Sequence, residues 1–75
     1  MKVEITEEAK QDLFDALEYY EFEQAGLGVR LRDEFAKVSV SIGTNPLLWR
    51  ERPEGYRRVN LPVFPYYIAF VIRKD

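Results

Sequence analysis

The sequence predicts an α+β domain in which a helical hairpin packs on a small antiparallel sheet, in the order β-α-α-β-β. Two observations predict this class. Residues 7–23 and 27–42 repeat apolar side chains at steps of three and four, which is typical of amphipathic helices. Short runs rich in β-branched and aromatic residues, typical of strands, lie before and after this pair. These runs span residues 2–5, 56–61 and 66–72.

The first strand and the first helix are joined at Thr6. Apolar and charged side chains alternate from Lys2 to Ile5, as in a strand with one buried face. The Thr6 hydroxyl can accept from an unpaired amide of the first helical turn, and this predicts an N-cap. We expect Gly26 to end the helix in the left-handed conformation. The predicted apolar stripe of this helix contains Ala9, Leu13, Ala16, Leu17 and Tyr20.

The second helix is predicted to stop in the sequence GTNP. Pro46 disfavours the helical conformation at Asn45, and Gly43 is a common turn residue. The short glycine-containing connection before this helix predicts an antiparallel hairpin of the two helices. The predicted apolar stripe of the second helix contains Leu27, Leu31, Phe35, Val38 and Ile42.

The last third of the chain supplies the rest of the sheet. We expect a loop from Asn45 to Gly55, a strand from Tyr56 to Leu61, and a break at the sequence PVFP. Tyr66 to Ile72 has apolar residues at consecutive positions. Such a run is expected where both faces of a strand are covered or where one neighbouring strand is missing.

Composition limits the chemistry of the chain. With 75 residues we expect one domain, residues 1–75. The absence of cysteine and histidine rules out disulfides, the usual zinc sites and histidine-based nucleophile activation. We therefore expect no metal, no cofactor and no catalytic residue, and the paired carboxylates are interpreted as a solvated helix face. The start lacks a signal sequence and no apolar run could cross a bilayer, so we expect a cytoplasmic protein without a membrane partner.

Charge is distributed unevenly along the chain. The first 25 residues carry eight acidic and two basic side chains, whereas residues 26–75 carry nine basic and five acidic ones. A solvated acidic helix beside a more basic sheet would explain this distribution. A basic face for an acidic or polyanionic partner would explain it as well.

A cluster of arginine and aromatic residues is the candidate partner-binding site. Forked arginine donors can hold carboxylate or phosphate groups, and aromatic rings can stack on a ligand. The same arginines would also fit ordinary surface ion pairs with Glu51 and Glu54. The cluster contains Trp49, Arg50, Arg52, Tyr56, Arg57 and Arg58.

Three stretches in this order carry a family resemblance: AKQDLFDALEYYEFEQAGLGVRLRDEF, IGTNPLLW and GYRRVNLPVFPYYIAFVI. Together they resemble the RelE/ParE superfamily of toxins from bacterial type II toxin-antitoxin modules, often named plasmid stabilization proteins. The resemblance covers nearly the whole chain and implies the fold predicted above. It also implies neutralisation by a cognate antitoxin and arrest of growth by the free toxin.

The branches of this superfamily differ in their targets. RelE-like members are ribosome-dependent mRNA endoribonucleases with basic residues at alternate strand positions, where this chain has Arg58 and then Asn60. The Pro65-Tyr66 region offers no arginine, and an isoelectric point near 5.1 disfavours docking on RNA. We therefore expect a ParE-like toxin that inhibits DNA gyrase by binding, without sequence-specific contact to nucleic acid.

The end of the sequence differs from the family pattern. Family members usually continue past the apolar strand into one more strand, which this chain lacks. We expect a free edge along Tyr66 to Ile72, filled by strand addition from an antitoxin or from a second copy. One alternative is a shortened, inactive remnant that still binds an antitoxin. A second alternative is a ribosome-dependent mRNA endoribonuclease.

Overall fold

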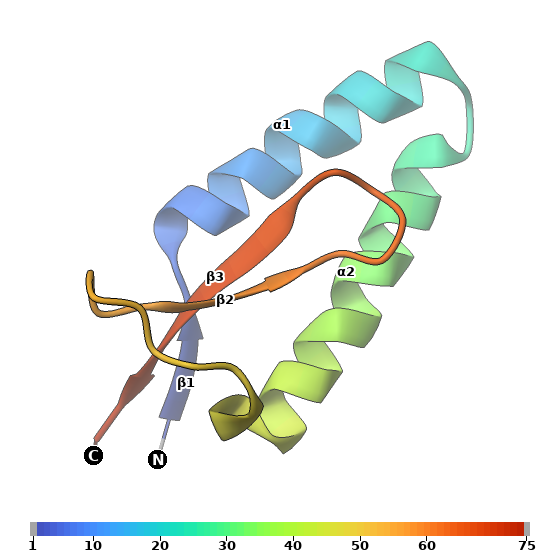
Figure 1. Ribbon diagram of the computed structural model, residues 1–75. Coiled ribbons are helices and arrows are strands. Elements are labelled where there is room, and N and C mark those ends of the chain that lie inside the picture. The colour runs from blue at the N-terminus through green and yellow to red at the C-terminus, as the bar shows by residue number, and fades with distance from the viewer. Residues whose placement is uncertain (1, 75) are drawn as a thin grey trace.

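The computed structural model describes residues 2–74 and has the predicted order of elements. Two antiparallel helices lie against a small antiparallel sheet, and this confirms the α+β class (Figure 1). The elements are β1 (Lys2–Ile5), α1 (Glu7–Glu23), α2 (Leu27–Thr44), the 3-10 helix η1 (Pro46–Leu48), β2 (Arg57–Asn60) and β3 (Tyr67–Arg73).

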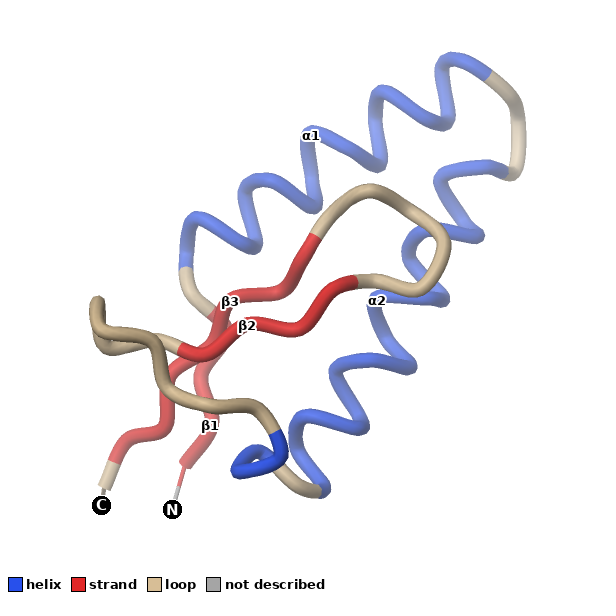
Figure 2. The backbone as a smooth tube through the Cα atoms, viewed as in Figure 1, coloured by secondary structure: helices blue, strands red, loops and turns tan. Residues whose placement is uncertain are grey.

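Within residues 2–74 the sheet has three antiparallel strands in the order β1-β3-β2. Strand β3 lies between the other two in this order, and Figure 2 shows its last part running beside β1. Strand β2 pairs with its first half, from Arg57 opposite Phe70 to Asn60 opposite Tyr67. Strand β1 pairs with its second half, where Ile5 lies opposite Phe70 and Lys2 opposite Arg73. The two ends of the chain therefore meet in one sheet.

The expected free edge along Tyr66–Ile72 is only partly present. Each side of β3 carries a strand of the same chain over about half of its length, β2 along Tyr67–Phe70 and β1 along Phe70–Arg73. The neighbour that seemed to be missing is β1, which comes from the opposite end of the sequence. The consecutive apolar residues of β3 reflect a central position in the sheet, with helices on one face.

Helix starts and the helix-helix turn follow local chemistry. Thr6 caps α1 as predicted, because its Oγ1 accepts from the Ala9 amide at 3.2 Å. Gly26 has a φ of 90°, in the left-handed region that favours glycine. At the start of α2, the Glu21 carboxylate accepts from the amides of Gly26 and Gly28 at 2.8 and 2.9 Å. A side chain of α1 thus satisfies otherwise unpaired amides of α2 and offsets its dipole.

The core lies between the helical hairpin and one face of the sheet. Both predicted apolar stripes face it, since every residue of the two stripes is either buried or partly buried. Burial of apolar surface in this layer is the main stabilising contribution in a chain of this size. The largest fully buried side chains are Leu31, Ile42, Ile68 and Phe70.

Several boundaries differ from the prediction. Strand β2 spans Arg57–Asn60 instead of Tyr56–Leu61, and β3 spans Tyr67–Arg73 instead of Tyr66–Ile72. Helix α2 continues through Gly43 to Thr44, because a glycine near a helix end costs only about 1 kcal/mol relative to alanine. The expected loop from Asn45 begins with η1, where Pro46 occupies the first position, a place at which its missing amide costs nothing. No helix within residues 2–74 combines the length and the apolar character needed to cross a membrane.

Candidate functional site

The two faces of the sheet differ in what covers them. Ile68 and Phe70 of β3 point into the core, and Val59 of β2 packs beside them. The residues between them point to the opposite face, because successive side chains of a strand alternate. We call this second surface the open face. It carries Tyr56, Arg58 and Asn60 from the β2 side and Tyr67, Ala69 and Val71 from β3.

Arg58 and Tyr67 form the centre of the open face. The guanidinium carbon of Arg58 lies 4.8 Å from the centroid of the Tyr67 ring. This distance is typical of a cation-π contact, which holds the arginine in a fixed direction without neutralising its charge. Tyr67 remains 46% exposed. An aromatic ring and an oriented cation are thus available to a partner.

Arg57 lies on the other face of the same strand. Its Nη1 donates to the Trp49 carbonyl oxygen at 2.6 Å. The Trp49 ring packs edge-on against Phe70, with ring centroids 6.1 Å apart. The contacts of Arg57 and Trp49 therefore fasten the segment after α2 to the core, and both residues are only partly exposed.

The segment before β2 is a turn that directs Tyr56 onto the open face. The Arg52 amide donates to the Tyr56 carbonyl at 2.8 Å, and the Gly55 amide donates to the Arg52 carbonyl at 2.9 Å. Gly55 has a φ of 94°, which a side chain would strain. Arg50 is exposed at the outer end of this segment. Among residues 2–74, none of the ion pairs joins an arginine of this cluster to Glu51 or Glu54.

Four of the six predicted residues therefore divide into two groups, and Arg50 and Arg52 lie on the turn before β2. Tyr56 and Arg58 come together on the open face, whereas Trp49 and Arg57 belong to the covered side. Tyr67 was not among the predicted residues. Its position opposite Asn60, and two residues before Ala69, the partner of Arg58, follows from the hairpin register. Alternation in both strands, counted from the PVFP turn, would have indicated it.

A shallow hollow on the open face has an acidic side. Tyr56, Tyr67 and Ala69 lie on the sheet side, and the beginning of α1 contributes Glu8 and Asp12. Carboxylates at this position repel a nucleic-acid backbone and attract basic groups. The hollow therefore combines two phenol rings with an acidic side.

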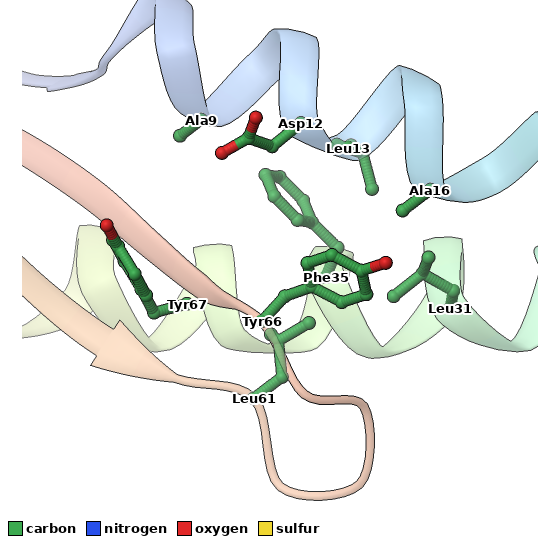
Figure 3. Close-up of a pocket in the computed structure, with 9 residues that line it drawn as sticks. All are labelled: Ala9, Asp12, Leu13, Ala16, Leu31, Phe35, Leu61, Tyr66 and Tyr67. Carbon is green, nitrogen blue, oxygen red and sulfur yellow. The ribbon is translucent and has the colours of Figure 1, made fainter.

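A second cavity lies inside, between the helices and the sheet. Figure 3 shows its lining, with the rings of Tyr66 and Tyr67 turned in different directions. Its volume is about 10 Å³, enough for about one water molecule and too small for a substrate. Partial burial is the main cause that raises the pKa of Tyr66 above its usual value, and the neighbouring Tyr20 hydroxyl raises it further. Tyr66 is thus a neutral packing residue at ordinary pH.

No group of three or more carboxylates within residues 2–74 is arranged to hold a metal ion. The open face presents an oriented guanidinium, two phenol rings and an acidic side. Arginine and tyrosine are residues that often dominate the energy of protein interfaces.

Comparison with known proteins identifies the family. Residues 3–75 match the family described as ParE toxin of type II toxin-antitoxin system, parDE. Searches of curated proteins and of solved structures each gave no significant match. The family has a toxin role and implies an antitoxin protein as a partner. Since the match covers nearly all of the sequence, the chain belongs to the ParE toxin family of type II toxin-antitoxin systems.

Proposed function

We propose that this toxin acts in the cytoplasm on DNA gyrase by binding to it, and that a cognate antitoxin neutralises it. The observation that carries the proposal is the open face, where Arg58 is held over Tyr67 beside the acidic hollow. Family membership supports the toxin role, and the chemistry of this face supports a protein as the target.

The charges of the open face favour binding over RNA cleavage. A phosphoryl-transfer site without histidine needs several cations around the scissile phosphate. Here Asn60 follows Arg58 on the same face of β2, and Arg73 is ion-paired with Glu4 at 3.2 Å. Glu8 and Asp12 add negative charge at the side of the hollow. This arrangement gives a phosphate backbone one oriented cation and repels it from the acidic side.

A protein target fits the same groups. The Arg58 guanidinium can form two parallel hydrogen bonds with a partner carboxylate. The exposed edge of Tyr67 supplies contact area at a small entropic cost, since its ring is already held by Arg58. Basic side chains of the partner would meet Glu8 and Asp12. We assign the remaining candidates Arg50 and Arg52, on the adjacent turn, to the rim of this contact, where charges mainly affect association rate.

The test is a gyrase assay with the purified protein. We expect the protein to inhibit supercoiling and to accumulate cleaved DNA in the presence of gyrase, and we expect the cognate antitoxin to reverse both effects. Arg58→Glu should abolish inhibition because it reverses the charge at the centre of the face. Arg50→Glu, a matched change on the exposed turn, should weaken inhibition only slightly.

Other outcomes separate the alternatives. Cleavage of messages on translating ribosomes, with gyrase unaffected, would establish the ribonuclease instead. Binding of an antitoxin without inhibition of gyrase or translation would establish an inactive remnant. Either result would overturn the proposed target.

A further inference from the structure

An apolar groove lies on the helical hairpin, and no residue of the open face lines it. Its lining comes from the two helices: Phe14 and Leu17 of α1 face Gly28 and Val29 of α2. Phe14 is 63% exposed and Val29 is 45% exposed. Phe22 lies one helical turn beyond Glu18 on α1, lines a neighbouring hollow that shares Glu18 with the groove, and is 90% exposed. Exposed large apolar side chains grouped in this way mark an interaction site.

Gly28 gives the groove its shape. A Cβ atom at this position would lie 2.9 Å from the Leu17 carbonyl oxygen and from a Glu21 carboxylate oxygen. The helices therefore approach closely at Gly28, and the larger side chains of Phe14 and Val29 stand on either side. The groove is thus part of the hairpin itself and does not depend on side chains of the sheet.

The two walls of the groove carry opposite charges. Glu18 stands on the α1 wall and Arg32 on the α2 wall. The side chain of Arg32 is 65% exposed, and its ion pair is with the adjacent Asp33 at 3.7 Å, a solvated contact of little strength. From Gln11 to Glu23, α1 has acidic side chains and no basic one. A purely basic or purely acidic partner helix would be attracted by one wall and repelled by the other.

We propose that a second copy of this chain occupies the groove and forms a two-fold symmetric dimer through the helical hairpins. A two-fold axis that runs along the groove places α1 of each subunit opposite α2 of the other, so that Glu18 of each subunit faces Arg32 of the other. The surface is therefore complementary to itself in charge. The exposed rings of Phe14 and Phe22 are buried against the partner helices, which removes apolar surface from water. The open face lies outside this contact and remains free for a target.

The first experiment measures mass against concentration by light scattering and sedimentation, with the full chain. We expect a monomer of 8.9 kDa at low concentration and a species of twice that mass at high concentration. A monomer at every concentration would overturn the proposal. Phe14→Ser, at an exposed position, should keep the helical circular dichroism and abolish the dimer.

Charge exchange tests the pairing itself. Glu18→Arg and Arg32→Glu should each give a folded monomer, because each change places like charges opposite one another. Mixing the two variants should restore a dimer with one copy of each, and the double variant should restore the symmetric dimer. Lys37→Glu, on α2 but beside Pro62, is the matched control and should dimerise like the original protein.

A mixture of the two charge variants that stays monomeric would rule out the Glu18 to Arg32 pairing. A dimer that persists in both single variants would place the contact elsewhere and would equally overturn the proposal. Neither result depends on gyrase inhibition, so dimer formation and the proposed function can fail independently.

Discussion

The two faces of β3 show how one strand serves two purposes. Ile68 and Phe70 have no exposed surface, whereas Tyr67, opposite Asn60 in the hairpin, is 46% exposed. The covered face contributes stability by burying apolar surface, and the open face presents groups that a partner can contact. In a chain of 75 residues few side chains can be released from the core. We therefore propose that the target is recognised by the face that the helices leave uncovered.

The neighbouring residues Arg57 and Arg58 show the same contrast between the covered face and the open face. Arg57 holds the Trp49 carbonyl at 2.6 Å on the covered side. Arg58 lies over the Tyr67 ring on the open side. Identical side chains thus have different roles, because strand alternation turns them to opposite faces. Substitutions that separate stability from binding are the means to test this contrast.

The largest effect is expected on the covered face. Phe70→Ala removes a fully buried ring and should lower the free energy of unfolding by about 3 to 5 kcal/mol, enough to unfold much of a small domain. Urea or thermal unfolding followed by circular dichroism measures this loss. Tyr67→Ala, three positions earlier and on the open face, is the comparison and should cost far less. Equal losses for the two variants would contradict the contrast between the faces.

The second effect separates the two arginines. Arg57→Ala should lower the free energy of unfolding by about 2 kcal/mol, because the Trp49 carbonyl loses a charged donor and the segment after α2 loosens. Arg58→Ala should change stability by less than about 0.5 kcal/mol, as is usual for a surface position, yet it should weaken inhibition of gyrase. Unfolding and supercoiling assays on both variants provide the check. A stable Arg57→Ala protein that has lost inhibition would assign Arg57 to the binding surface instead.

Most of the fold could be predicted from local patterns. The helix stripes, the Thr6 cap and the left-handed Gly26 all depend on neighbours within a few residues, and all are present. The position of β3 could not be predicted in this way. Its pairing with β1 joins the two ends of the sequence, and nothing local in either segment specifies such a distant partner.

The candidate site shows the same limit. Residue type and closeness in sequence predicted the cluster of arginine and aromatic residues. Closeness in sequence also placed Arg57 and Arg58 in one group, although the two side chains lie on opposite faces of β2. The direction of each side chain follows from strand register, and Tyr67 enters the site only through that register. The hollow beside it depends on Glu8 and Asp12, whose helix reaches the sheet through tertiary packing.

The third effect concerns the attachment of the β2-β3 turn to α2 beneath the covered face. The Glu34 carboxylate accepts from the amides of Val63 and Phe64 at 2.9 and 3.3 Å. Glu34→Ala leaves these amides without their acceptor and should lower the free energy of unfolding by about 1 kcal/mol. Asp33→Ala, at the exposed neighbouring position, should have a smaller effect in the same urea titration. The contrast between the faces would be weakened if Glu34→Ala reduced gyrase inhibition without reducing stability.

The smallest effect is a dependence of stability on pH above the neutral range. Burial and the neighbouring Tyr20 hydroxyl raise the pKa of Tyr66 in the folded protein above the value of about 10 that it has in the unfolded chain. The folded state then holds this proton more tightly, so the contribution is fully present below about pH 10 and is lost as pH rises through the folded pKa. Tyr66→Phe keeps the ring and removes the proton. The urea midpoint of the original protein should therefore fall relative to that of the variant as the pH rises from about 9 to about 11. If the difference between the two urea midpoints stayed constant over this pH range, Tyr66 would be as well solvated as a residue of the open face.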